Sequence, residues 1–206
     1  MQPNDSYRLN CRKRYAYSGL HCLNWFNPSD ILKAMSDYRR VYIPGGCYFF
    51  TVVTYRRQAI FADGRNVARL RQAFKAVKAK RPFELTAEVV LPDHLHCIWQ
   101  LPEGDANYSV RWQMIKTDFS RSMTTEVNAD AAKTVWQPRF FEHCIRDEAD
   151  FQRHLDYIHY NPVKHGLTDS PANWPHSSFR RFVAGGEYPL HWGNAGVPAS
   201  ADFDCE

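Results

Sequence analysis

The sequence predicts an α+β fold with the element order β-α-β-β-α-β and a further helix after the fourth strand. Three observations predict it. Short runs rich in β-branched and aromatic residues alternate with longer runs in which apolar residues recur every three or four positions. Pro, Gly and Asp residues separate these runs. The chain has 206 residues, 44% of them hydrophobic and 23% charged, which is typical of one globular domain with appendages.

The first strand is expected at residues 47–55 (CYFFTVVTY), where β-branched and aromatic residues dominate. The first helix is expected between Asp63 and Pro82, since proline is excluded from a helix interior. The apolar stripe of this helix follows the helical period and consists of Val67, Leu70, Phe74 and Val77.

Two strands follow closely, at residues 83–91 and 94–101, with a tight turn at Pro92-Asp93. Ser109 is the expected cap of the second helix. The stripe of that helix is Trp112, Ile115, Phe119 and Met123. A fourth strand is expected within residues 135–145, after a polar loop.

Asp147 is expected to cap the third helix, which should run to about Tyr160 and face the core with Phe151, Leu155 and Ile158. This order of elements is that of the ferredoxin-like split-βαβ fold, an antiparallel four-stranded sheet with two helices on one face. The strand at 94–101 is central in such a sheet, and the third helix can pack near the other face. The domain is expected at residues 35–183, between an N-terminal extension (1–34) and an acidic C-terminal tail (184–206).

Positive charge is unevenly distributed along the chain. Residues 39–81 contain eleven Lys or Arg and a single acid, Asp63. After Arg181 there is no Lys or Arg, and the charged residues are all acidic. A basic body of this kind favours a polyanionic partner, although an ordinary solvated surface is the commoner explanation. The six cysteines form no Cys-x-x-Cys pair and are expected to be reduced, as in the cytoplasm. No apolar run approaches the roughly 20 residues of a membrane span, so no membrane partner is expected.

His94 and His96 stand one residue apart in a predicted strand, so both side chains point to the same face. Two imidazoles at this spacing can bind one divalent cation, although such a pair is more often incidental. On the third helix, Tyr157 and Asn161 lie four apart and therefore on one face, one turn apart. A carboxamide oxygen can ligate Mg²⁺ or Mn²⁺. The combined set offers two imidazoles, an oxygen ligand and a phenol.

Each residue of the helical pair also has a simpler interpretation. Because Pro162 follows Asn161, the helix is expected to end or bend there, and Asn161 could simply cap the next segment. Tyr157 and Tyr160 could be packing residues. A phenol, with an ordinary pKa of about 10, is a poor nucleophile unless a metal polarises the electrophile. With a phosphodiester as electrophile, the phosphotyrosine product conserves the ester energy, which suits strand transfer.

The residues 92–99 (PDHLHCIW) resemble the His-hydrophobe-His motif of the HUH single-tyrosine nucleases. Residues 154–167 (HLDYIHYNPVKHGL) resemble the catalytic helix of the REP-associated tyrosine transposases within that group. Further runs similar to this family are 38–46, 135–143 and 173–179, and the resemblance covers about residues 36–192.

The resemblance implies that Tyr157 is the nucleophile, forming a 5′-phosphotyrosine bond to single-stranded DNA. It implies that His94 and His96 are metal ligands and that Asn161 is the third, where insertion-sequence relatives have glutamine. It implies a Mg²⁺ or Mn²⁺ cofactor and palindromic repeat hairpins as substrates. Tyr160 aligns with a variable position.

The expected partner is therefore single-stranded or hairpin DNA in a bacterial cytoplasm, bound by a monomer or a homodimer. Candidate contacts to its phosphates are Arg39, Arg40, Lys75, Lys78 and Lys164. Two alternatives remain open: a hairpin-binding regulator without turnover, and a replication-initiator or relaxase-type HUH nuclease.

Overall fold

The structure is a computed structural model, which describes residues 40–123 and 135–196. The predicted fold class is confirmed. Its four antiparallel strands are β1 (Cys47–Val53), β2 (Glu84–Val90), β3 (His94–Gln100) and β4 (Phe141–Cys144). They pair in the order β2-β3-β1-β4, so β3 is an inner strand, as expected.

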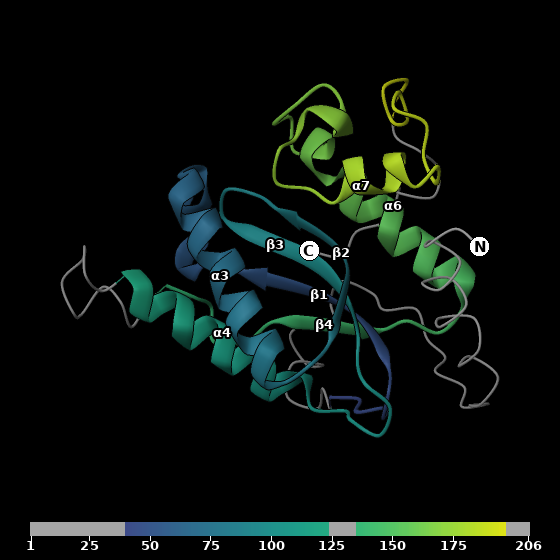
Figure 1. Cartoon of the computed structure of the whole chain (residues 1–206). Coiled ribbons are helices and arrows are strands. Elements are labelled where there is room, and N and C mark those ends of the chain that lie inside the picture. The colour runs from purple at the N-terminus through teal and green to yellow at the C-terminus, as the bar shows by residue number, and fades with distance from the viewer. Residues whose placement is uncertain (1–39, 124–134, 197–206) are drawn as a thin grey trace, which may run out of the picture.

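The helices α3 (Gly64–Lys80) and α4 (Tyr108–Met123) lie side by side on one face of the sheet (Figure 1). The predicted stripe of α3 is buried there against Phe50 and Trp99 of the sheet, and so is most of the stripe of α4. Asp63 caps α3 by accepting a hydrogen bond from the backbone of Arg65. The predicted cap of α4 was wrong: the cap lies two residues earlier, at Asn107, which accepts the bond from the backbone N–H of Val110.

The helices α6 (Glu148–Lys164) and α7 (Phe179–Ala184) lie on the other face of the sheet (Figure 1). There Leu155 and Ile158 pack against Phe49 and Ile98 of the sheet. Asp147 caps α6 through the backbone N–H of Asp150, as predicted.

The predicted end of α6 near Tyr160 was wrong, because the helix continues through Pro162 to Lys164. The backbone N–H groups of His165 and Leu167 bond to the carbonyls of Asn161 and Pro162. The ring of Pro162 removes one donor, but these bonds close the last turn. Asn161 therefore lies inside a helix and does not cap a new segment.

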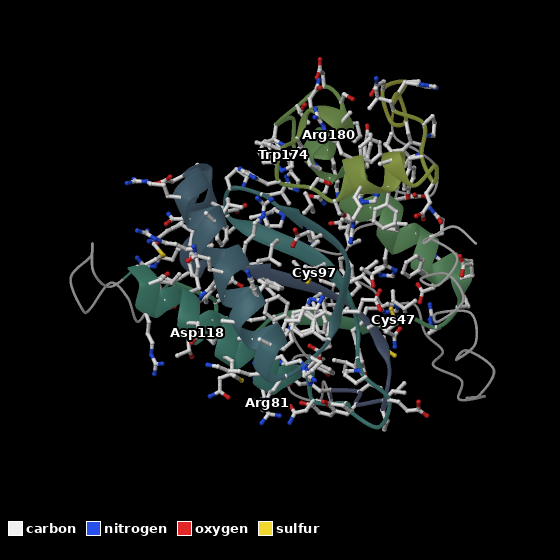
Figure 2. All side chains as sticks on the ribbon, in the orientation of Figure 1. Cys47, Arg81, Cys97, Asp118, Trp174 and Arg180 are labelled. Carbon is white, nitrogen blue, oxygen red and sulfur yellow. The ribbon has the colours of Figure 1, made fainter. Side chains whose placement is uncertain are left out.

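The C-terminal part closes over α6. The hydroxyl of Tyr188 donates to Asp156, and the indole of Trp174 donates to the carbonyl of Val90 in β2, 3.0 Å away. Figure 2 shows Trp174 and Arg180 together in this part of the molecule. Residues 185–196 of the expected acidic tail thus include a buried side chain, that of Tyr188, whereas residues 1–34 and 197–206 lie outside the described residues. Within 40–123 and 135–196, no helix is long and apolar enough to span a membrane.

Candidate functional site

The two histidines of β3 lie on the face of the sheet that α6 covers. Their rings are 4.9 Å apart, and both residues are buried. Leu95 and Cys97, between and beside them, point into the cluster under α3 and α4, as the alternation of a strand requires.

Helix α6 brings the predicted nucleophile to this pair. The ring centroids of Tyr157 and His96 are 5.1 Å apart, and Phe49 of β1 packs against both rings. Asn161 follows one turn later and is 1% exposed. His165 follows after another turn, with its ring 5.2 Å from that of His94. The structure thus brings together within one chain the strand and helix residues that the sequence singled out.

Each histidine is oriented through its Nδ1 atom. The Nδ1 of His94 lies 2.6 Å from the carboxylate of Asp93, which can only accept, so His94 donates and its Nε2 keeps a lone pair. The Nδ1 of His96 lies 2.9 Å from the hydroxyl of Thr51, its partner across the β1–β3 ladder. Because these bonds use the Nδ1 atom of each ring, a cation would be bound through Nε2, and such outer partners are usual for metal-binding histidines.

The polar atoms of this set fit a divalent cation. Among the described residues, the buried Nε2 of His96 and both amide atoms of Asn161 have no hydrogen-bond partner. Buried polar atoms normally have one, so these atoms suit a ligand that the protein atoms do not supply. Imidazole nitrogen together with amide oxygen is a donor set that Mg²⁺ or Mn²⁺ accepts.

Electrostatics keep the imidazole of His96 neutral, the form that binds a metal. Burial lowers the pKa of His96 well below its ordinary value, and nearby positive charges add to this effect. Two of those charges belong to Lys164 and Arg57. Burial would raise the pKa of Asp93, but hydrogen bonds from His94 and Arg57 outweigh it and keep this carboxylate ionised.

A second group of potential ligands lies where α6 begins. Nitrogen and oxygen atoms of His143, Asp150 and His154 all lie within 4.8 Å of one another. The carboxylate of Asp150, however, also accepts from the backbone and side chain of Arg146 and from Arg153. Two guanidinium groups already neutralise it and oppose a further cation. We interpret this cluster as the ionic anchor of α6 to β4.

The five predicted phosphate contacts do not form one surface. Lys164 lies at the site, with its Nζ atom 5.0 Å from the centroid of the Tyr157 ring. Lys75 and Lys78 are exposed on α3, on the opposite face of the sheet. Arg40 pairs with the buried carboxylate of Glu142 at 3.0 Å. Arg39 lies outside the described residues.

Four residues at the site were missed from the sequence, namely Thr51, Arg57, Asp93 and His165. Asp93 directly precedes His94, and its charge was a signal, although the sequence showed it only as a turn residue. Thr51 could be found only from the strand register. Arg57, which bonds Asp93 at 3.3 Å, had no signal, because it lies in a short turn with positive φ at both Arg56 and Arg57.

The neighbouring residues of α6 point elsewhere. Tyr160 packs edge-on against Trp192. His159 lies 3.0 Å from the hydroxyl of Ser178, within the core of the C-terminal part. Among the described tyrosines, Tyr157 is therefore the one in ring contact with the histidine pair.

Comparison with known proteins gives a consistent result. Residues 46–161 match the family model described as "Transposase IS200 like". The REP-associated tyrosine transposase of Escherichia coli (strain K12) is 49% identical over 159 residues, 77% of this chain and 91% of the relative. A relative from Haemophilus influenzae is 45% identical over 167 residues, 77% of this chain and 94% of its own length. A solved REP-associated tyrosine transposase bound to a REP hairpin superposes with a TM-score of 0.71 and 46% identity, covering 82% of this chain and 96% of that one.

Proposed function

Because this chain belongs to the IS200-like transposase family, and within it to the REP-associated tyrosine transposases, we propose that it cuts and rejoins single-stranded DNA at palindromic hairpins through a covalent bond to Tyr157. Members of this family are DNA nicking and strand-transfer enzymes. The hairpin substrate is inferred from the solved relative, which is bound to a REP hairpin. The proposed place of action is the bacterial cytoplasm.

The observation that carries the proposal is the contact between Tyr157 and His96. A phenol on a helix lies against an imidazole on a strand, with their ring centroids 5.1 Å apart. His94 and Asn161 flank this contact, and both are buried. This arrangement supports a role for Tyr157 as nucleophile beside a set of ligand atoms, as attack on a phosphodiester requires.

In the proposed reaction, the phenol oxygen of Tyr157 forms a bond to phosphorus, and the bond from phosphorus to the 3′-oxygen breaks. The products are a free 3′-hydroxyl and a 5′-phosphotyrosine, so the number of phosphoester bonds is unchanged. A 3′-hydroxyl from another strand can reverse the attack and join to the 5′ end. The chain therefore needs no water activation for strand transfer.

His94, His96 and Asn161 are the residues that would hold a divalent cation, Mg²⁺ or Mn²⁺. When bound, such a cation polarises the phosphate oxygens and offsets the charge that develops on them. Asp93 and Thr51 fix the ring orientation of the two histidines, so that both present Nε2. Phe49 packs against Tyr157 and helps to position the phenol.

The test is incubation of the protein with single-stranded hairpin DNA and Mg²⁺ or Mn²⁺, followed by a denaturing gel. We expect a covalent protein–DNA adduct that Tyr157→Phe abolishes and the matched control Tyr160→Phe retains. An adduct that persists in Tyr157→Phe would show that the nucleophile is wrongly assigned. Hairpin binding without any adduct in the wild type would instead favour a regulator without turnover.

The third possibility, a replication-initiator or relaxase-type nuclease, is set aside by the family match. Such enzymes often use more than one catalytic tyrosine. Here Tyr160 packs against Trp192, which supports a reaction with Tyr157 alone.

A further inference from the structure

We propose that Lys164 is a second catalytic residue, whose ammonium group binds the phosphate that Tyr157 attacks. This inference rests on the proposed function, since it assigns a role at the same bond. It goes beyond a general contact to the DNA backbone, because it places the charge at the reacting phosphate.

The position of Lys164 carries the inference. It stands seven residues after Tyr157, two turns further along α6, and therefore on the same face of the helix. Its Nζ atom lies 5.0 Å from the centroid of the Tyr157 ring. Tyr157 is 1% exposed, whereas Lys164 is exposed to solvent. An incoming phosphate that reaches the phenol therefore meets the lysine.

The chemistry of an ammonium group suits this place. It carries three hydrogen-bond donors and no acceptor, so it is suited to bind phosphate oxygens. The C-terminus of a helix has a negative dipole end, which opposes a phosphate. A cation in the last turn of α6 reverses the sign of that field where the substrate must lie.

The electrostatic need is largest during the reaction. As the phenol oxygen attacks, negative charge accumulates on the non-bridging phosphate oxygens. The imidazole of His96 meets the Tyr157 ring edge-on, and the ammonium group of Lys164 lies over the same ring. The proton lost by the phenol balances the proton gained by the departing 3′-oxygen. The same ammonium therefore acts in cleavage and in rejoining.

The first experiment measures single-turnover adduct formation and hairpin affinity for the wild type and Lys164→Ala. We expect the rate to fall about 100-fold, as for loss of one charge-stabilising donor at a reacting centre. We expect the dissociation constant for the hairpin, measured in EDTA, to rise by less than about threefold, because one phosphate contact among many is lost. Lys164→Arg should recover most of the rate. The matched control is Lys80→Ala, since Lys80 is likewise exposed in the last turn of a helix but belongs to α3.

The second experiment uses a hairpin with a neutral methylphosphonate at the scissile position. If Lys164 neutralises the charge of the scissile phosphate, cleavage of the neutral substrate should depend less on Lys164. The ratio of wild-type to Lys164→Ala rates should then fall from about 100 to below about 10. An unchanged ratio would overturn the inference. The inference would also be overturned if Lys164→Ala lost rate, hairpin affinity and thermal stability in proportion, because that result would indicate a structural role.

The two proposals fail in different ways. A Tyr157-dependent adduct that forms at the normal rate in Lys164→Ala overturns the role of Lys164 and leaves the proposed function intact. A wild-type protein that forms no adduct overturns both.

Discussion

The two faces of the sheet are built from the same four strands but differ in chemistry. Toward α3 and α4 the strands present apolar and aromatic side chains, among them Phe50, Leu95 and Trp99. Toward α6 they also present the histidine pair and Thr51. One strand, β3, contributes to both faces through simple alternation. The comparison shows how alternation along a strand lets both sides of one layer pack a core while only one side also holds the histidine pair.

Both faces bury polar atoms that have no hydrogen-bond partner among the described residues, but the atoms differ in kind. Toward α3 and α4 they are the indole nitrogens of Trp99, Trp112 and Trp136. An indole N–H only donates and cannot bind a metal. Toward α6 they include the imidazole nitrogen of His96 and the amide of Asn161, which are ligand atoms. The second set can bind a cation, whereas the first set cannot.

The largest effect is expected where the α3/α4 face is broken. Trp112 is fully buried and stacks on Trp99, with the ring centroids 4.4 Å apart. Trp112→Ala should lower the free energy of unfolding by about 4 kcal/mol, measured by urea titration. Gln113→Ala, on the exposed side of the same helix, should change it by less than about 0.5 kcal/mol. A small loss in Trp112→Ala would mean that this face is not the main source of stability.

The next effect concerns the ionic anchor of α6. Asp150→Asn should lower the free energy of unfolding by about 2 kcal/mol, because the buried Asp150 carboxylate accepts hydrogen bonds from Arg146 and Arg153 that its negative charge strengthens. The measurement is again chemical denaturation, at pH 7. Adduct formation should fall only in proportion to the folded fraction. A specific loss of activity in a fully folded variant would contradict the structural role.

The same anchor predicts a dependence on pH. Burial would raise the pKa of Asp150, but hydrogen bonds from His143 and His154 outweigh it and hold the pKa far below its ordinary value. A carboxyl group whose folded pKa is depressed stabilises the protein above its unfolded pKa of about 3.9 and loses that contribution as the pH falls further. The stability difference between wild type and Asp150→Asn should therefore shrink below about pH 4.

A smaller effect is expected at the outer partner of His94. Asp93→Asn leaves the turn in place but replaces the ionised acceptor at Nδ1 by a neutral amide. The affinity for Mn²⁺ should fall about 10- to 100-fold, measured by calorimetry on the metal-free protein. Asp118→Asn on α4 is the control, and it should bind Mn²⁺ normally. Equal affinities in both variants would remove Asp93 from the site.

The smallest effect has the opposite sign. Asn161→Leu keeps the branching of the side chain but replaces by methyl groups two buried polar atoms that have no hydrogen-bond partner among the described residues, so it should raise the free energy of unfolding in EDTA by about 1 kcal/mol. It should also abolish the stabilisation that Mn²⁺ gives the wild type. Thermal unfolding with and without metal checks both statements. A variant that is destabilised in EDTA would indicate that the amide serves the fold.

Much of the fold could be predicted because its signals are local. The stripe of α3 and the run of β1 each follow one period, and Asp147 caps α6 where expected. The errors have local causes too. Asn107, and not Ser109, is placed to cap α4. The last turn of α6 closes beyond Pro162 because the backbone N–H groups of His165 and Leu167 bond to carbonyls of that turn.

The candidate site was predictable only in part, because its supports are not local. His94, His96, Tyr157 and Asn161 could be found from spacing and from family resemblance. Thr51 reaches His96 across a strand pairing, and Arg57 reaches Asp93 from a turn with two left-handed residues. Neither contact can be predicted from the spacing of residues along the chain.

The packing of Tyr160 against Trp192 has a stoichiometric consequence. With Tyr157 as the one phenol of the described residues in ring contact with the histidine pair, a chain that reacts as proposed can carry a single broken DNA end at any moment. A segment of DNA has two ends. Its release therefore requires either two chains acting together or one chain acting twice, with the first end rejoined before the second is cut.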